Sequence, residues 1–358
     1  MNLALLRVKP YIPRKAFSIR YYPANLIEKY IRSGYKSYSS GGNLLLTASP
    51  SRNFGNNLQL AVADPNSGKV LGTYTDSTLY ANLAQAGWDG KYIYAITYNG
   101  TMYLYKFTPT LGLLIKTTLP YSSSYEGGIA VGKQYIMLAG AGSGTGVIIT
   151  DKNGNVVTTI ALPSGLDAMQ VAYIEGVFYA IDSSQPYNIY AISEQTLSIT
   201  SSGVASYSQA ISRTGFPIVA INSYVFVASA YIGNRCAGSM VTQFTPTLSA
   251  VNYNANGSCI TGASINHTGI AWDSQNVYLV DGEYQDYLII PLSDLSQSTY
   301  VSGAYTFMQG GKLTYTSYID SKYNLYVGTL DPATGNSKVF PTGINAGGYT
   351  IYSVIPLI

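Results

Sequence analysis

The chain has 358 residues and a formal net charge of +3, and only 10% of its side chains are charged against 47% that are hydrophobic. About a quarter of the residues of an ordinary soluble protein are charged, so this surface must be built mainly from hydroxyl and amide side chains and from the 35 tyrosines. One histidine and two cysteines exclude a multi-histidine or cysteine-rich zinc site, and no apolar run approaches the roughly 18 residues of a membrane-spanning helix.

Residues 1–42 are predicted to be a basic N-terminal arm outside the repeats that follow. They hold eight basic residues and one acid, for a net charge of +7, whereas residues 43–358 carry −4. This asymmetry predicts that the arm docks on an anionic partner. Pro23 and Gly34 bracket a short predicted helix over Ala24–Ser33. The side chains expected to anchor the arm are Arg7, Lys9, Arg14, Lys15, Arg20, Leu26, Ile27, Tyr30 and Ile31.

Two roles remain open for this arm: an anchor in a neighbouring subunit of a larger assembly, or a strap across the chain's own repeats. The arm carries no recognised nucleic-acid-binding motif. Met1–Leu6 is too short an apolar run for a secretory signal, and basic residues follow it directly, which predicts synthesis in the cytosol. A signal peptide that has been trimmed away is the alternative.

From residue 43 onward, a recurring turn predicts a repeat architecture. The turns begin at Asp64, Thr108, Asp151, Ser193, Thr245, Ser293 and Asp331. These positions lie 44, 43, 42, 52, 48 and 38 residues apart. Residues 88–120 show the unit, because Asn99-Gly100 and the turn Thr108–Gly112 separate three runs rich in aromatic and β-branched residues. A period of about 40–50 residues with four short strands per unit predicts a β-propeller.

The two ends of the sequence predict how the ring closes. Six units have a further strand before this pattern, that of the last unit being Tyr305–Gln309, whereas the first unit, from Leu44, has none. A lone strand, Gly348–Val354, stands near the C-terminus. We therefore expect an all-β, seven-bladed β-propeller over residues 43–358, closed by the C-terminal strand completing the first blade. A β-sandwich or a solenoid is the alternative.

Several second strands share a pattern of alternating aromatic and aliphatic residues. It appears in Lys91-Tyr-Ile-Tyr94, Val177-Phe-Tyr179 and Asn276-Val-Tyr-Leu279. On these motifs, residues 43–357 resemble the seven-bladed propellers of the YVTN and NHL-like type. The resemblance implies the architecture and specifies no activity.

Two loops of the fifth blade are predicted to meet on one face, because they follow its second and fourth strands. Cys236 and Cys259, the two cysteines of the chain, lie in these loops and are expected to form a disulfide, with two free thiols as the alternative. The Asn-x-Ser/Thr sequons at Asn99, Asn256 and Asn266 fall in predicted loops of that face. Glycosylation is expected there, although Asn99-Gly100 is also a favourable turn.

The same face collects the residues best suited to bind a ligand. Tyrosine offers a large, rigid contact surface, and loop carboxylates at a channel mouth are candidates to hold an ion or a substrate. The expected ligand face consists of Tyr98, Tyr125, Glu126, Asp182, Asp281, Glu283 and Tyr284. Residues 281–286 resemble part of a calcium loop but lack its full spacing. No catalytic residue, metal site or cofactor is therefore predicted.

The sequence predicts a non-enzymatic virion or surface structural protein. Its composition is typical of an extracellular protein while its start is typical of a cytosolic one, and a virion protein reconciles the two because it assembles in the cell and leaves with the particle. In composition the chain resembles structural proteins of viruses of hot, acidic archaeal hosts. The arm would join other subunits of a homo- or hetero-oligomeric assembly, and the propeller would attach to a host glycan or protein.

Two alternatives remain open. One is a secreted propeller enzyme of lactonase or lyase type with a divalent ion at the channel mouth. His267 would have to serve any Ser-His-Asp arrangement in such an enzyme, since it is the sole histidine. The other alternative is a cell-surface adhesion module without a virus.

Overall fold

A computed structural model describes most of the region after the N-terminal arm. The described residues are 43–50, 58–76, 84–99, 101–121, 128–139, 146–183, 187–206, 210–211, 218–221, 224–230, 236–254, 259–261, 268–272, 275–281, 286–301, 316–320, 322, 324–330, 336–345 and 349–357. The predicted arm, its helix and the predicted strand Tyr305–Gln309 lie outside these ranges.

The described residues form an all-β structure of seven antiparallel sheets. The strands are β1 (Asn43–Pro50), β2 (Leu58–Ala63), β3 (Val70–Asp76), β4 (Ala84–Trp88), β5 (Ile93–Asn99), β6 (Thr101–Phe107), β7 (Leu113–Thr118), β8 (Ile129–Val131), β9 (Tyr135–Leu138), β10 (Val147–Asp151), β11 (Val156–Ile160), β12 (Ala168–Ile174), β13 (Val177–Asp182), β14 (Tyr187–Ser193), β15 (Ser198–Ser206), β16 (Ala210–Ile211), β17 (Ile218–Ile221), β18 (Tyr224–Ala230), β19 (Cys236–Phe244), β20 (Ala250–Asn254), β21 (Cys259–Thr261), β22 (Thr268–Trp272), β23 (Asn276–Asp281), β24 (Asp286–Pro291), β25 (Thr299–Val301), β26 (Thr316–Ile319), β27 (Asn324–Leu330), β28 (Ser337–Asn345) and β29 (Tyr349–Leu357).

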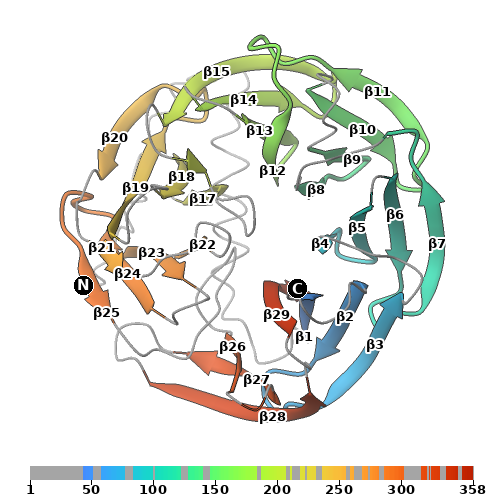
Figure 1. Cartoon of the computed structure of the whole chain (residues 1–358). Helices are drawn as coiled ribbons and strands as arrows, with labels where there is room; N and C mark the ends of the chain where they lie inside the picture. Colours follow the sequence, from blue (N-terminus) through green and yellow to red (C-terminus); the bar gives the residue numbers. More distant parts are fainter. Residues whose placement is uncertain are drawn as a thin grey trace, which may run out of the picture.

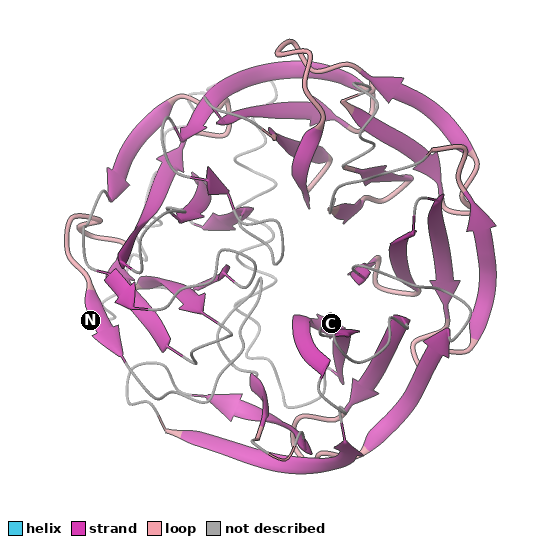
Figure 2. Ribbon diagram, in the orientation of Figure 1, coloured by secondary structure: helices cyan, strands magenta, loops and turns pink. Residues whose placement is uncertain are grey.

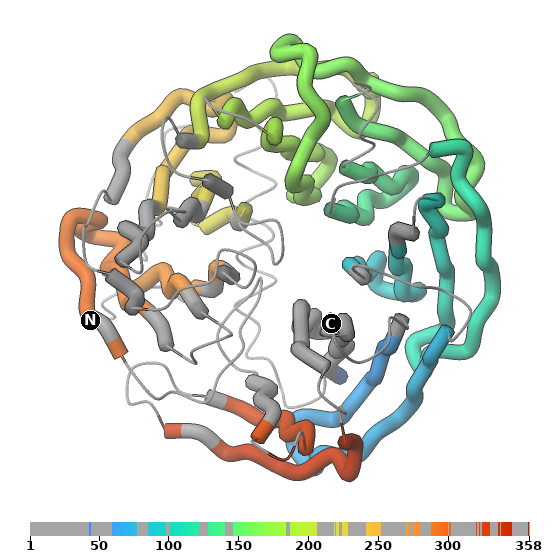
Figure 3. The backbone as a smooth tube through the Cα atoms, in the orientation of Figure 1, coloured from blue at the N-terminus to red at the C-terminus, as the bar shows by residue number. Residues whose placement is uncertain are grey.

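The sheets stand around a common centre in chain order (Figures 1 and 3). We number them sheet 1 (β29-β1-β2-β3), sheet 2 (β4–β7), sheet 3 (β8–β11), sheet 4 (β12–β15), sheet 5 (β16–β21), sheet 6 (β22–β25) and sheet 7 (β26–β28). Strands β29, β4, β8, β12, β17 and β22 lie nearest the centre, and each contacts the next one along this series. Strands and the turns between them make up the described part of the chain (Figure 2), and no helix long and apolar enough to cross a membrane occurs there.

The chain's last strand belongs to its first sheet. β29 pairs antiparallel with β1 over its length, from Asn43 opposite Leu357 to Pro50 opposite Tyr349. Sheet 1 therefore consists of one strand from the C-terminal end of the chain and three strands that follow the arm.

The hydrophobic cores lie between neighbouring sheets, and alternate residues of one strand serve two of them. In β5, Ile93 and Ala95 pack with side chains of sheet 1, whereas Tyr94 and Ile96 pack with side chains of sheet 3. Because successive side chains of a strand point to opposite faces, a strand covered on both faces must be apolar throughout. This explains the continuous apolar and aromatic runs of the inner strands.

The predicted turn lies before the outermost strand of each sheet in which it is described. Five of these turns contain a residue with a left-handed backbone, namely Gly68, Leu111, Gly154, Leu197 and Leu248. Side-chain oxygens close the turns as well: Thr108 Oγ1 accepts from the amide of Gly112 at 2.9 Å, and Thr245 Oγ1 accepts from the amide of Ser249 at 3.1 Å. The repeat is therefore marked by a hydrogen-bonded turn, with the left-handed residue in its fourth or fifth position in these five cases.

Leucine occupies three of the left-handed positions, and in two of them it also fills the core. Leu111 has a φ of 65° and Leu248 a φ of 60°, and their side chains are buried. The left-handed conformation costs about 1–2 kcal/mol for a residue with a Cβ, whereas burying a leucine contributes about 1.5–3 kcal/mol. Burial therefore offsets the strain, and the turn is fastened to the core by its own strained residue.

Three outer strands, β3, β7 and β15, also support the turn of the next sheet. Gly72 of β3 packs against the backbone of Thr110, so closely that a Cβ at this position would collide with the Thr110 carbonyl. Gly203 of β15 lies in the same way against the backbone of Leu248. On β7, the hydroxyl of Thr117 donates to the carbonyl of Asn153 at 3.3 Å. Contact between an outer strand and the following turn thus recurs around the perimeter.

A β-bulge follows each of five turns, at the second or third residue of the outer strand. The extra residues are Leu71, Leu114, Val157, Thr200 and Val251. Bulges increase local twist and disturb the regular ladder of an edge strand. They also turn three apolar side chains outward, since Leu114, Val157 and Val251 are each about half exposed.

Sheet 5 departs from the four-strand pattern. Its strands β18 and β19 extend beyond the repeat, and the short strands β16 and β21 pair with their extended ends. The sequence did not predict these two strands. They explain the longer turn spacing in this part of the chain.

The predicted disulfide between Cys236 and Cys259 stays a prediction. Strands β19 and β21 pair antiparallel, so the two segments come together as expected, with Cys236 opposite Thr261 and Cys259 opposite Gly238. The cysteines are therefore two residues out of direct register, and their side chains lie outside what the structure describes.

The buried turn leucines predict a measurable difference between two neighbouring substitutions. Leu111→Ala should lower the free energy of unfolding by about 2–4 kcal/mol, because it removes a buried side chain and keeps the strained backbone. Leu113→Ala, two residues further on, should change it by less than about 1 kcal/mol, since Leu113 is 44% exposed. Guanidinium denaturation measures both, and equal losses would contradict the role given to Leu111.

Candidate functional site

The structure describes only part of the predicted ligand face. Tyr125, Glu126, Glu283, Tyr284, Asn256 and Asn266 lie outside the described residues. Tyr98 and Asn99 end β5, and Asp281 ends β23, so their backbones lie where β5 and β23 turn towards the next strands. That these residues bind a ligand remains a prediction.

Asp182 is fully buried at the end of β13, and it accepts hydrogen bonds from the strand that follows, β14. Its carboxylate accepts hydrogen bonds from the backbone amide and the side-chain amide of Asn188, both at 2.8 Å. The hydroxyl of Tyr190 lies 3.4 Å from the same carboxylate. Burial raises the pKa of Asp182 above its ordinary value, against the hydrogen bonds from Asn188, which favour the charged form. Asp182 therefore closes the connection between β13 and β14.

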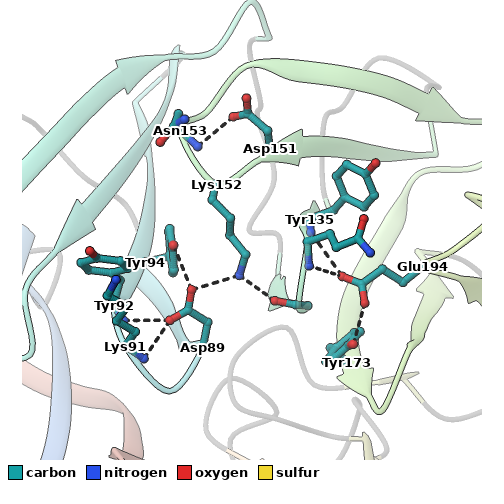
Figure 4. A network of polar contacts seen from close by, with 12 residues as sticks. Asp89, Lys91, Tyr92, Tyr94, Tyr135, Asp151, Lys152, Asn153, Tyr173 and Glu194 are labelled. Carbon is teal, nitrogen blue, oxygen red and sulfur yellow. Dashed lines mark hydrogen bonds and ion pairs between the residues drawn. The ribbon is translucent and has the colours of Figure 1, made fainter.

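A network of charged side chains joins sheets 2, 3 and 4 at the opposite ends of the strands (Figure 4). It is built from the turns between the first and second strands and from those before the outer strands. Two side chains link the sheets, Lys152 and Glu194, and each is the second residue of a recurring turn. Neither was singled out by the sequence analysis.

Lys152 joins the turn of sheet 3 to the turn between β4 and β5. Its ammonium group donates to Asp89 Oδ2 at 3.2 Å and to the carbonyl of Gly132 at 2.6 Å. It also lies 4.9 Å from the centre of the Tyr94 ring. Burial lowers the pKa of Lys152, and the neighbouring Lys106 acts in the same direction, whereas Asp89 opposes both.

Asp89 uses both carboxylate oxygens within this network. Oδ1 accepts from the amides of Lys91 at 2.9 Å and Tyr92 at 2.8 Å, and Oδ2 accepts from the Tyr94 hydroxyl at 3.0 Å as well as from Lys152. Burial alone would raise the pKa of Asp89, but these donors bring it below its ordinary value. The carboxylate is therefore held charged and has no oxygen left without a partner.

Glu194 makes the equivalent connection from sheet 4 to sheet 3. Its Oε1 accepts from the amides of Gln134 at 2.7 Å and Tyr135 at 3.2 Å, and its Oε2 accepts from the Tyr173 hydroxyl at 2.6 Å. Only 4% of Glu194 is exposed. Burial raises the pKa of Tyr173 well above its ordinary value, and the hydrogen bond to Glu194 adds to the effect. A buried carboxylate thus closes the first turn of the neighbouring sheet.

A second salt bridge joins sheets 1 and 2 on the other face. Lys116 lies 2.8 Å from Asp76, and the same oxygen accepts from the buried Tyr105 hydroxyl at 3.0 Å. Burial, with the hydrogen bond to Asp76, raises the pKa of Tyr105. Here too a carboxylate at the end of one sheet is satisfied by donors from the next.

These groups form no constellation suited to catalysis. Among the described residues, no three His, Cys, Asp or Glu side chains come together in a way that could hold a metal ion. The buried carboxylates accept hydrogen bonds from neighbouring strands and turns, so their chemistry is the joining of sheets. Ammonium groups of Lys91 and Lys106, which lie over the Tyr92 ring, remain at the surface of the network.

The sequence did contain a signal for Lys152 and Glu194. The second residue of the recurring turn is proline in the other turns that begin with Asp64, Thr108, Thr245 and Asp331. Where proline is replaced by a long charged residue, that side chain reaches the preceding sheet. Only the spatial arrangement reveals what it contacts there.

Searches against known proteins find similarity in fold only. No family model matches the chain, and no curated protein does. A hypothetical selenium-binding protein from Sulfolobus tokodaii has a similar structure, with a TM-score of 0.58 and 9% identity, over 89% of this chain and 94% of that one. BamB from Moraxella catarrhalis aligns with a TM-score of 0.47 and 13% identity, over 81% of this chain and 82% of that one. At 9% identity the likeness concerns the fold alone, and four-stranded antiparallel sheets around a centre are of the β-propeller type.

Removing the charge of Glu194 should weaken the connection between sheets 3 and 4. Glu194→Gln keeps the shape but loses charge-assisted bonds to two amides and a hydroxyl, so unfolding should require about 1–3 kcal/mol less. The matched control is Gln195→Ala in the same turn, where the exposed side chain predicts a change within about 0.5 kcal/mol. Chemical denaturation of both variants tests this, and an unchanged Glu194→Gln protein would refute the connection.

Asp89 should contribute stability that depends on pH in the acid range. Because its folded pKa is depressed, the contribution is present above its unfolded pKa and is lost as the pH falls through the folded value. Asp89→Asn should therefore have a lower melting temperature than the native chain above about pH 4, and the gap should narrow below it. Melting curves of both proteins, recorded from pH 2 to pH 7 in steps of roughly one pH unit, measure this difference in melting temperature. A gap that stays constant down to the lowest pH would contradict it.

Proposed function

We propose that this chain is a non-enzymatic structural protein of a virion or cell surface. In this proposal the N-terminal arm, residues 1–42, fixes it to other subunits of the assembly, and the propeller displays its loops to a host surface. The observation that carries the proposal is the use of the buried charged groups. Asp89, Lys152 and Glu194 all join one sheet to the next. Such a chain is built as a scaffold that presents a surface.

We further propose that the seven sheets are the blades of a closed ring. Two contacts support closure between sheet 7 and sheet 1. Gly68, in the turn of sheet 1, lies against the backbone of Pro341 in β28, which repeats the contact between outer strand and following turn seen elsewhere. β26 of sheet 7 also contacts β29 of sheet 1. Closure would leave only short, protected edges, as propellers require.

The charge distribution supports the role given to the arm. The arm carries +7 while the rest of the chain carries −4, so the two parts prefer different partners. A basic arm that docks on an anionic neighbour would leave the weakly charged propeller facing outward. A propeller poor in charge has few groups to titrate, which suits an extracellular or acid-exposed surface.

Electron microscopy of the native source material tests the proposed role. Regularly arrayed propellers on a particle or envelope, with the arm between subunits, are the expected result. Free monomers, together with a metal ion retained by the purified protein, would contradict it and favour an enzyme. Microscopy also separates a virion from a cell-surface layer, because the two differ in the object that carries the array.

Deleting residues 1–42 should abolish assembly and leave the propeller folded. The expected result is a soluble monomer whose melting temperature is within a few degrees of that of the full chain, since the repeats begin at residue 43. Sedimentation velocity and melting curves measure the two properties. A truncated chain that still assembles would refute the anchoring role, whereas a truncated chain that unfolds would indicate a strap across the propeller.

A further inference from the structure

Two lysines of sheet 2 surround one tyrosine ring. The ammonium group of Lys106 lies 4.5 Å from the centre of the Tyr92 ring, and that of Lys91 lies 4.9 Å from the same centre. Lys91 belongs to the turn before β5, while Lys106 lies on β6 opposite Tyr94. The negative face of an aromatic ring attracts cations, so Tyr92 holds both ammonium groups close to its ring.

The neighbouring Tyr94 ring extends this cluster. Lys106 lies 5.8 Å from its centre, and Lys152 lies 4.9 Å from it. Three ammonium groups thus border two adjacent rings at the junction of sheets 2 and 3. We call Lys91, Lys106, Lys152, Tyr92 and Tyr94 the lysine–tyrosine cluster.

The cluster has an excess of positive charge. Two carboxylates, Asp89 and Glu194, act on Lys152, against three lysines in the cluster. Both oxygens of Asp89 are already engaged by Lys152, the Tyr94 hydroxyl and two amides. The salt bridges of the described residues include none to Lys91 or Lys106. Lys91 and Lys106 lie near the same ring and repel each other, and an anion bound by both would reduce this repulsion.

The cluster is open to solvent on the side of these two lysines. Lys91 is exposed, and Tyr92 and Lys106 are partly exposed, whereas Lys152 is turned inward to Asp89 and Gly132. A ligand therefore meets two ammonium groups already positioned beside a tyrosine ring. Preorganisation of this kind reduces the entropy lost on binding.

We propose that Lys91 and Lys106 bind an oxyanion, sulfate or carboxylate, carried by a sugar chain. This rests on the proposed function, and it names the class of surface glycan that the propeller would recognise. Two lysines match one or two anionic groups, whereas a nucleic acid requires a groove of cations that follows its backbone. The tyrosine ring beside them offers a flat surface for the sugar. The site lies at the opposite ends of the strands from the ligand face predicted from the sequence.

Calorimetric titration with a heparin-derived octasaccharide tests the site, with an uncharged dextran oligosaccharide as the reference ligand. The native chain should bind the octasaccharide and not the dextran at about 50 mM salt. K91Q/K106Q should weaken binding about tenfold or more, because it removes both ammonium groups. The matched control is K69Q/K338Q, which removes two exposed lysines elsewhere and also changes the net charge from +3 to +1. The control should change the affinity by less than about threefold.

Two further variants keep the test decisive. K91R/K106R retains the charges and should retain binding, while K91E reverses one exposed charge with little risk to folding and should abolish it. Equal losses in K91Q/K106Q and K69Q/K338Q, or a native chain that does not bind the octasaccharide, would overturn the site. Tighter binding of single-stranded DNA than of the octasaccharide would overturn the assignment to glycans.

The site and the proposed function can fail separately. Assembled propellers that do not bind the octasaccharide would refute the site and leave the structural role intact. A chain that binds the octasaccharide through Lys91 and Lys106 but never assembles would refute the structural role and leave the site.

Discussion

Packing between neighbouring sheets is the constraint on which the rest of this structure depends. Each sheet is small, and its apolar faces are covered only by the sheets on either side. Ile93 and Tyr94 are adjacent in the chain yet belong to different cores, one shared with sheet 1 and one with sheet 3. The stability of each sheet therefore depends on its contacts with the neighbouring sheets, as in other repeat architectures. A ring satisfies this demand without leaving a terminal face uncovered.

The recurring turn sets the spacing between sheets. Its left-handed residue, whether Gly68 or the buried Leu111, aligns the chain for the outer strand, and the same turn rests on the outer strand of the preceding sheet. One local motif therefore serves two purposes, since it ends a strand pair and positions the next sheet. The bulge that follows it twists the outer edge and disturbs its ladder, which discourages pairing with other strands.

Charged residues are few, and several of those described join neighbouring sheets. Lys152 and Glu194 cross from one sheet to the preceding one, and Asp76 and Lys116 do so on the other face. Buried charges persist only where their hydrogen-bonding capacity is satisfied, and here turn amides and tyrosine hydroxyls satisfy it. Lys91 and Lys106 are different because they hold ring contacts but no carboxylate. They are therefore the groups in this region that we assign to an external partner.

The sequence by itself determined the strand content, the repeat and the position of the recurring turns. These are local properties: turn chemistry at Thr108–Gly112 and alternating apolar residues act within a few positions of the chain. The tertiary structure decided which side chains meet. The sequence could not show this, because such contacts depend on strand register and on residues that are distant in the chain. The pairing of β19 with β21, which places Cys236 and Cys259 two residues out of direct register, is one such contact. Lys152 and Glu194 lie in ordinary turns of the sequence, and only the packing of neighbouring sheets brings Asp89 and the amides of Gln134 and Tyr135 within their reach.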